Sequence, residues 1–418
     1  MIDRTLRPDV QQISSIALVE PSVLSLQNAI PLNWIANGAN EAFKLDLHFE
    51  AGILNGDKLT AIAANELLLS GTKDKTSSEI HEALDLLGGF VNAEVSQEDA
   101  VISLYGLIEH FQPLVKLFIS TLQNADFPTQ ELERYIQSKS QAFLIAQEKV
   151  AVLARKQFLA TLFPDLPYGK QTQLEDIKGI NREEVKQFYF NHYKNQLHFV
   201  ALVGAVKEED IHFLNEQLAG FSLSKAAKKS HTFQHHKKEI TIEKEGSVQT
   251  AIRVGRLLFN RLHEDYMDFT LLNTLLGGFF GSRLMKEIRE NKGYTYGISS
   301  GIAQSTEMGY FFISTEVKKE VKEDALNAIK IELEKLQHEL VPTTELDLVK
   351  SYTLGQLLKG SDGPFAMMER YLVLKHYGLD LSYYDKLVAR VQSITPERLQ
   401  ELAKKYLNWE DMIRVSVG

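Results

Sequence analysis

A sequence pattern that occurs twice constrains the fold of this chain more than any other feature. Three separate segments return at one offset of 214 residues: 128–132 as 342–346, 180–183 as 394–397, and a strand ending at Gly204 as one ending at Gly418. The second pair of segments precedes a short amphipathic helix and then an apolar strand in both copies. Three matches at one offset predict a duplicated module of about 200 residues.

The length and composition limit the classes of protein to which the chain can belong. Its 418 residues suffice for two domains, and a net charge of −9 gives no electrostatic support for binding nucleic acid. The absence of cysteine excludes disulfides, thiolate zinc sites and thiol catalysis. No segment approaches the apolar length of a membrane span, and the N-terminal segment lacks the apolar core of a signal peptide. We therefore expect no membrane span and a cytoplasmic location.

A change in composition separates the two copies. Residues 222–247 are polar, rich in lysine and histidine, and poor in large apolar side chains over most of their length. We expect a solvated linker here, between an N-terminal module at 1–221 and a C-terminal module at 248–418.

Three histidines of this linker have a spacing that could suit a metal. His231 and His235 are four residues apart, as ligands on one helical face would be, and His236 follows directly. The linker has neither a clear helical pattern nor supporting carboxylates. Ordinary solvated histidines are the better interpretation.

Each copy combines alternating strands with amphipathic helices. The patterns predict strands at 44–49, 99–107, 248–254 and 309–316, and helices at 58–69, 129–147, 264–276 and 321–338. Strands and helices do not alternate singly, as they do in βαβ units. This indicates the α+β class, with two homologous modules that each have a mainly antiparallel sheet covered by helices.

Five motifs add a more specific signal. They are 67–72 (LLLSGT), 87–93 (LGGFVNA), 162–169 (LFPDLPYG), the strand from Tyr193 to Gly204, and 281–296 (GSRLMKEIRENKGYTY). In these motifs, taken in order, the chain resembles the pitrilysin and mitochondrial-processing-peptidase (insulinase-type) family of zinc metallopeptidases. The resemblance covers nearly the whole chain and implies the LuxS/processing-peptidase-like metallohydrolase fold.

The resemblance also implies that the zinc site of the family has been lost in this chain. Active relatives carry an inverted H-x-x-E-H motif, whose histidines bind zinc and whose glutamate is the general base. The corresponding positions here are Ile62, Asn65 and Glu66, and the third ligand of the family falls at Gln141 or Ala142. Isoleucine has no lone pair, and asparagine takes no proton from water near neutral pH. We therefore expect no zinc in this chain and a degenerate motif.

Two residues of the second half keep the family pattern. Arg289 and Tyr296 match the arginine and tyrosine that active relatives place opposite zinc. A guanidinium and a phenol suit that place because both donate hydrogen bonds to a substrate carbonyl and its developing oxyanion. An ordinary ion pair for Arg289 and ordinary packing for Tyr296 are the alternatives, and the surrounding motif favours the functional role.

Asn92 and Ala93 are a further candidate site. In relatives this segment lies on an edge strand that pairs with extended substrate peptide. A simple turn after Gly88 and Gly89 explains the same residues equally well.

Two hypotheses of function follow from the resemblance. The first is the non-zinc subunit of a heterodimeric metallopeptidase, which supplies Arg289 and Tyr296 to a zinc-bearing paralogous partner and helps to bind peptide. The alternative is a peptidase-like binding or structural subunit with no proteolytic role. Zinc is expected in the partner, and self-dimerisation of the isolated chain stays open.

Overall fold

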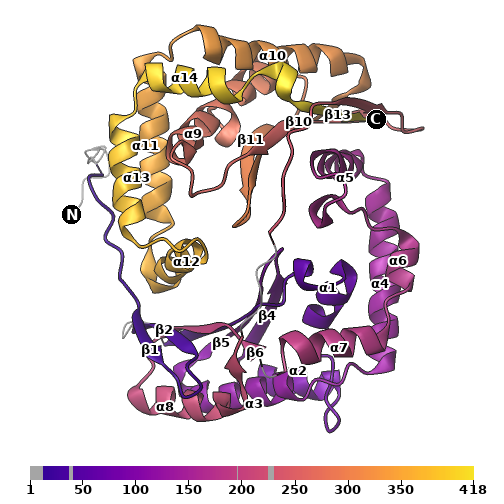
Figure 1. Cartoon of the computed structure of the whole chain (residues 1–418), viewed down its shortest axis with the longest axis vertical. Coiled ribbons are helices and arrows are strands. Elements are labelled where there is room, and N and C mark those ends of the chain that lie inside the picture. Colours follow the sequence, from indigo (N-terminus) through magenta and orange to yellow (C-terminus); the bar gives the residue numbers. More distant parts are fainter. Residues whose placement is uncertain (1–12, 37–40, 195, 225–229) are drawn as a thin grey trace, which may run out of the picture.

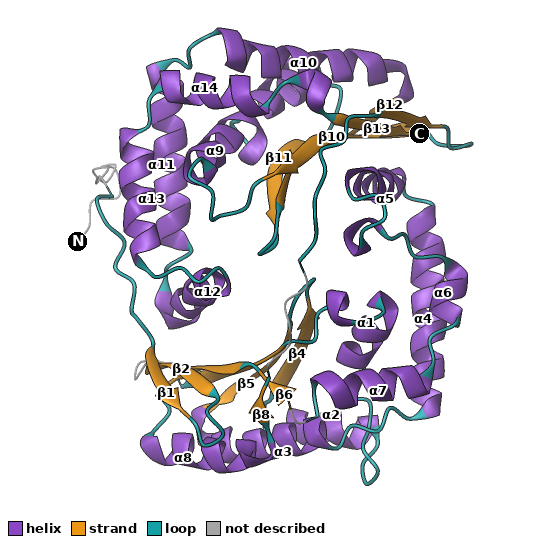
Figure 2. Cartoon of the chain, viewed as in Figure 1, coloured by secondary structure: helices purple, strands orange, loops and turns teal. Residues whose placement is uncertain are grey.

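The computed structural model describes residues 13–36, 41–194, 196–224 and 230–418. Its elements form a ring, in which two sheets face one another across the middle and helices surround them (Figure 1). Helices and strands mix in both halves, which confirms the α+β class (Figure 2). None of the helices in these ranges is long and apolar enough to span a bilayer.

The first half of the chain supplies a six-stranded sheet, a small two-stranded sheet of β6 and β8, and the helices around them. The strands of this half are β1 (Ser22–Ser25), β2 (Pro31–Ala36), β3 (Ala42–Phe49), β4 (Phe90–Val95), β5 (Ala100–Leu107), β6 (Gln196–Leu197), β7 (Phe199–Gly204) and β8 (Ser222–Leu223). Its helices are α1 (Lys58–Glu66), α2 (Ser77–Leu86), α3 (Phe111–Gln123), α4 (Thr129–Gln147), α5 (Val150–Leu162), α6 (Leu174–Lys178), α7 (Arg182–His192) and α8 (Glu208–Gln217).

The second half repeats this plan. Its strands are β9 (Glu239–Ile242), β10 (Gln249–Leu258), β11 (Ile298–Gln304), β12 (Gly309–Lys318) and β13 (Ile413–Val417). Its helices are α9 (Tyr266–Asn273), α10 (Lys322–His338), α11 (Thr343–Lys359), α12 (Gly363–His376), α13 (Ser382–Ser393) and α14 (Pro396–Tyr406).

The strand order shows that the two modules are copies of one another. The strand order of the first sheet is β1-β2-β7-β3-β5-β4. The strand order of the second sheet, read from the β9 edge, is β9-β13-β10-β12-β11. In each sheet one pair is parallel, β2 with β7 and β9 with β13, and the other neighbours are antiparallel. Without β1, the two orders are the same strand by strand.

The repeated segments of the sequence are helix starts. Pro128 precedes α4 and Pro342 precedes α11, with nearly the same backbone angles, because a proline in an extended conformation suits the position before a helix. Asn181 caps α7 and Thr395 caps α14 through their side-chain oxygens. The offset of 214 residues therefore marks equivalent helices in the two modules.

The predicted elements differ from the structure mainly at their ends. The helix expected at 58–69 ends at Glu66, and the one expected at 264–276 is α9 followed by a π-helical turn, Thr274–Gly278. The strand expected from Tyr193 begins only at Gln196, because Tyr193 closes α7.

Two equivalent helices cross between the modules. Helix α5, from the first half, packs on β10 and β13 of the second sheet, and α12, from the second half, packs on β7 of the first sheet. Phe158 of α5 is fully buried there, in a cluster with Val415. Met368 of α12 is buried against Val203 in the same way. Each module thus completes the core of the other.

The segment 222–247 is not a solvated linker throughout, so this expectation is wrong for the parts described. β9 lies within it and pairs with β13, and Phe233 packs against Phe163 with the rings 6.1 Å apart. Its His231 bonds Glu307, with Nδ1 2.7 Å from Oε2. The contacts with β13 and Glu307 tie the segment to the second module, and the contact with Phe163 ties it to the first half. The boundaries at 221 and 248 stay a prediction.

Candidate functional site

The positions that correspond to the zinc motif lie on α1, which Asp57 caps by accepting hydrogen bonds from the backbone of Leu59 and Thr60. The helix packs against α7 and β4. Ile62 is half-buried, Asn65 is buried and Glu66 is exposed.

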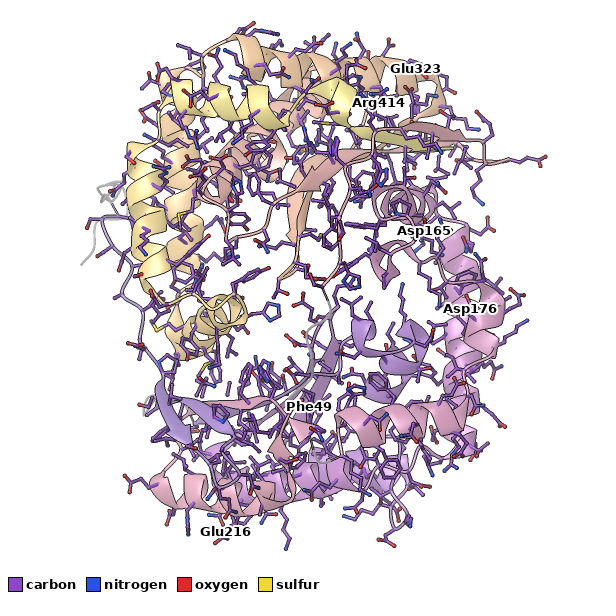
Figure 3. The ribbon with its side chains drawn as sticks, in the orientation of Figure 1. Phe49, Asp165, Asp176, Glu216, Glu323 and Arg414 are labelled. Carbon is purple, nitrogen blue, oxygen red and sulfur yellow. The ribbon has the colours of Figure 1, made fainter. Side chains whose placement is uncertain are left out.

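Two hydrogen bonds hold the Asn65 side chain inside the protein. Its Nδ2 donates to the Tyr193 hydroxyl at 3.1 Å and to the backbone oxygen of Glu94 at 3.3 Å. The centre of the Tyr193 ring lies 4.9 Å from the centre of the Phe49 ring (Phe49 is labelled in Figure 3). Burial raises the pKa of Tyr193 well above its usual value, so the hydroxyl stays protonated. Asn65 therefore has a structural partner where active relatives have a general base.

Glu66 faces a lysine instead of a metal. The Lys139 ammonium, on α4, lies 2.6 Å from one carboxylate oxygen of Glu66 and 2.9 Å from the other. The same ammonium lies 5.2 Å from the centre of the Tyr135 ring. A fixed cation therefore already occupies the one metal-binding group that remains among the motif positions.

Neither residue at the third ligand position carries a carboxylate. Gln141 and Ala142 are exposed on α4. The nearest carboxylate further along, Glu148, bonds the Lys244 ammonium at 2.9 Å. It lies nine residues beyond Lys139, or about 13 Å along the helix axis. The residues present do not fit zinc, and the described residues include no group of three His, Cys, Asp or Glu that could hold a metal.

Arg289 and Tyr296 lie on one segment of the second module. Arg289 belongs to the π-helical turn Met285–Asn291, and its guanidinium stacks 4.6 Å from the centre of the Phe280 ring. The chain then turns at Gly293, whose φ of 66° favours glycine, and reaches Tyr296 just before β11. The Tyr296 side chain is 95% exposed.

A shallow hollow of about 290 Å³ adjoins this tyrosine. It is lined by residues before the start of β11, on the facing part of β12 and at the start of β10: Thr295, Tyr296, Gly297, Ser314, Thr315, Glu316 and Gln249. The Thr295 hydroxyl donates to the backbone oxygen of Glu316 at 2.8 Å, which fixes the loop that carries Tyr296. The hollow is open and largely polar.

Asn92 and Ala93 lie on a strand and not in a turn. β4 is the last strand of its sheet, and these residues pair with Ser103 and Ile102 of β5. The other edge of β4 has no strand neighbour among the described residues. Phe90, at the start of this strand, is 63% exposed. This is the geometry that an extended peptide needs for strand addition.

Lys139 and Tyr193 are the site residues that the sequence did not reveal. Each lies far along the chain from its partner, 73 residues from Glu66 and 128 residues from Asn65. The sequence did offer one signal for Lys139. This lysine stands on the predicted helix 129–147, about one turn before the third ligand position of the family.

Models of one protein family match both halves of the chain. Residues 54–173 match the model of insulinase, peptidase family M16, and residues 179–352 match the model of the peptidase M16 inactive domain.

Individual relatives agree with these matches. An uncharacterized zinc protease of Mycobacterium leprae is 23% identical over 353 residues, which cover 82% of this chain and 78% of the relative. A Helicobacter pylori protein named as a non-peptidase homolog is 22% identical over 353 residues, covering 83% of this chain and 81% of its own length. The solved peptidase M16 inactive domain from Pseudomonas fluorescens matches with a TM-score of 0.86 and 25% identity, over 96% of this chain and 98% of that structure. The chain belongs to the insulinase family of peptidases, family M16, and its second half is of the inactive-domain type.

Proposed function

We propose that this chain is the non-zinc subunit of a heterodimeric zinc metallopeptidase. Its partner is a paralogous subunit with an intact inverted motif, which carries the zinc. This chain supplies Arg289 and Tyr296 to the partner's site and helps to hold the peptide substrate. The cytoplasmic location expected from the sequence is part of this proposal.

The exposure of Tyr296 is the observation that carries the proposal. A tyrosine that is 95% exposed gains almost nothing from burial in the isolated chain. Arg289 lies on the same segment, and no ion pair within the described ranges includes it. The exposed phenol, and a guanidinium whose described contact is stacking on the Phe280 ring, are available to a substrate held by a second subunit.

The edge strand β4 supports the peptide-binding part of the proposal. Around Asn92 and Ala93, the edge of β4 away from β5 has no strand neighbour in the described part of the chain. The backbone groups of alternate residues along this edge suit an unfolded peptide of varied sequence. The Asn92 side chain donates to Glu94 at 2.7 Å and so is directed along its own strand. Backbone pairing would therefore supply most of the affinity.

Substitutions at the two donors test the proposal in the assembled enzyme. We expect Arg289→Ala or Tyr296→Phe to lower turnover of a peptide by roughly 10–1000-fold without preventing assembly, as for lost oxyanion donors. The matched control is Lys286→Ala, which removes an exposed charge from the same π-helical turn. A complex that stays fully active without both donors would contradict the proposal.

The second candidate is a peptide-binding or structural subunit with no proteolytic role. The Helicobacter pylori relative, named as a non-peptidase homolog, favours it. Under this candidate the chain would still bind peptide, but no partner would give a complex with peptidase activity.

A further inference from the structure

A half-buried arginine outside the sites described so far has no acidic partner. Arg261 lies in the loop between β10 and α9, and three tyrosine rings surround its guanidinium. The ring centres are 5.7 Å away for Tyr266, 5.6 Å for Tyr377 and 5.4 Å for Tyr383. Its Nε atom is buried without a hydrogen-bond partner, and no ion pair within the described part of the chain includes this side chain. The tyrosine rings stabilise the half-buried cation in part, but they supply no negative charge to pair with it.

This guanidinium lines a pocket of about 390 Å³ together with a second one. Arg370 of α12 donates from Nε to the Gly360 oxygen at 2.6 Å and from Nη2 to the Leu357 oxygen at 3.1 Å. Its guanidinium stacks 5.0 Å from the Tyr384 ring centre. These bonds hold Arg370 in place by backbone oxygens, which leaves its positive charge without a carboxylate.

Most of the remaining pocket wall is apolar or aromatic. It is formed by Tyr266, Thr270, Leu357, Ala366, Val373, Tyr383, Tyr384 and Leu387. The one carboxylate of the wall, Glu369, is bonded to the Lys44 ammonium at 3.5 Å and is 66% exposed. The pocket shares no residue with the hollow beside Tyr296.

We propose that this pocket binds the terminal carboxylate of a peptide that ends in an apolar residue. Two guanidiniums without acidic partners supply the positive charge that a carboxylate requires, and the Nη groups not used by backbone oxygens supply the donors. The aromatic and aliphatic wall suits the apolar side chain next to that carboxylate. The volume lies at the small end of ligand pockets, which fits one or two residues and not a longer segment.

The choice of a peptide as ligand rests on the proposed function, but the test does not. Binding is measured on the isolated chain by calorimetry, with N-acetyl-leucyl-phenylalanine and with its C-terminal amide. We expect the acid to bind about tenfold or more tightly than the amide, because only the acid carries the charge that Arg261 and Arg370 need. This comparison uses the wild-type chain and needs no variant to fold.

Variants assign the binding to the pocket. Arg261→Gln should weaken binding of the acid by about tenfold or more and leave the amide unchanged. Arg414→Gln is the matched control, since it removes the same charge from β13, where Arg414 pairs with Glu239. β13 and α12 are labelled well apart in Figure 1, and Arg414 itself is labelled in Figure 3. This control should bind the acid as the wild type does.

Three results would overturn the proposal. They are equal binding of acid and amide, unchanged binding in Arg261→Gln, or an equal loss in Arg414→Gln. Inorganic phosphate is a separate arm of the test. If phosphate binds through Arg261 while the acid shows no advantage over the amide, the pocket takes a free anion and the peptide assignment is wrong.

Discussion

Asn65 and Glu66 show how this chain satisfies a helix that carries a metal site in its relatives. Asn65 bonds the Tyr193 hydroxyl and Glu66 bonds the Lys139 ammonium, so α1 is tied to the rest of its module without a metal. Lys139 and Glu66 are both about 40% exposed, and an ion pair of this kind is worth at most about 1 kcal/mol. The contact with Lys139 matters more for excluding a second cation than for stability.

Restoring the motif alone should not restore the metal. We expect the variant Ile62→His, Asn65→Glu, Glu66→His to hold no stoichiometric zinc and to cleave no peptide. The third ligand near Gln141 is still absent, and the Lys139 ammonium repels a cation at this place. Elemental analysis of tag-free protein measures the zinc.

A stepwise control separates the two causes. Adding Gln141→Glu supplies a carboxylate, and adding Lys139→Gln removes the repulsion, so zinc should appear only as these changes accumulate. One tightly held zinc per chain in the first variant, or in the wild type at these positions, would contradict the account.

Sequence reasoning identified the motif positions because each can be counted from a neighbouring motif. Whether Asn65 or Glu66 has a partner depends on which distant residue the fold brings to it, and Tyr193 and Lys139 could not be counted in that way. The three tyrosines around Arg261 could not be grouped from the sequence either, because they lie in three separate parts of the chain.

The contact between two equivalent hairpins joins the modules. The turn between β4 and β5 carries Glu98, which accepts hydrogen bonds from the backbone and hydroxyl of Thr306, in the turn between β11 and β12. His376, at the end of α12, pairs with both Glu98 at 3.0 Å and Asp99 at 2.9 Å. The three elements thus meet in one ionic cluster.

Titration of His376 should make this cluster depend on pH. Hydrogen bonds to Asp99 and then Glu98 raise the pKa of His376 to about 9, above its ordinary 6.5. Burial alone would raise the pKa of Glu98, but the bonds from His376 and Thr306 bring it below its ordinary 4.5. The stabilisation by His376 is therefore complete below pH 6.5 and lost as the pH rises through about 9. The stabilisation by the Glu98 carboxylate is present above pH 4.5 and is lost in more acidic solution.

The variant His376→Gln checks this dependence. Between about pH 5 and 6.5 we expect its melting temperature to lie below that of the wild type by about 2–4 °C, and the difference to vanish above about pH 9. His212→Gln, at an exposed histidine, should show no such profile. A difference that stays constant from pH 6 to pH 10 would show that His376 acts only through packing.

Helix α5 shows the limit of sequence reasoning at the scale of elements. Its apolar face indicates that the helix is buried, and the pattern of alternation located β12 and α4 within a residue or two. The pattern does not say which sheet a helix covers. Only the fold brings Phe158 against a strand that begins some 90 residues later, and α12 against β7.

At the scale of the whole molecule, the exchange of α5 and α12 should hold the halves together after a cut. We expect limited trypsin digestion to cleave first within 222–247 and to give fragments of about 25 and 20 kDa. Because each half completes the core of the other, the fragments should still elute together from a sizing column and separate only in denaturant.

Two outcomes would count against this arrangement. A first cut deep inside residues 100–200 would contradict the module boundary. Fragments that separate without denaturant would contradict the role of the exchanged helices.

The whole molecule is a ring of two modules. In the proposed heterodimer, the zinc chemistry belongs to a second chain. The most direct measurement is peptide cleavage by the isolated chain, by a zinc-bearing relative with an intact motif, and by their copurified complex. We expect this chain alone to be inactive and the complex to be more active than the relative alone. We also expect a chelator to abolish the activity of the complex. An isolated wild-type chain that proved to be a chelator-sensitive peptidase would contradict the heterodimer proposal.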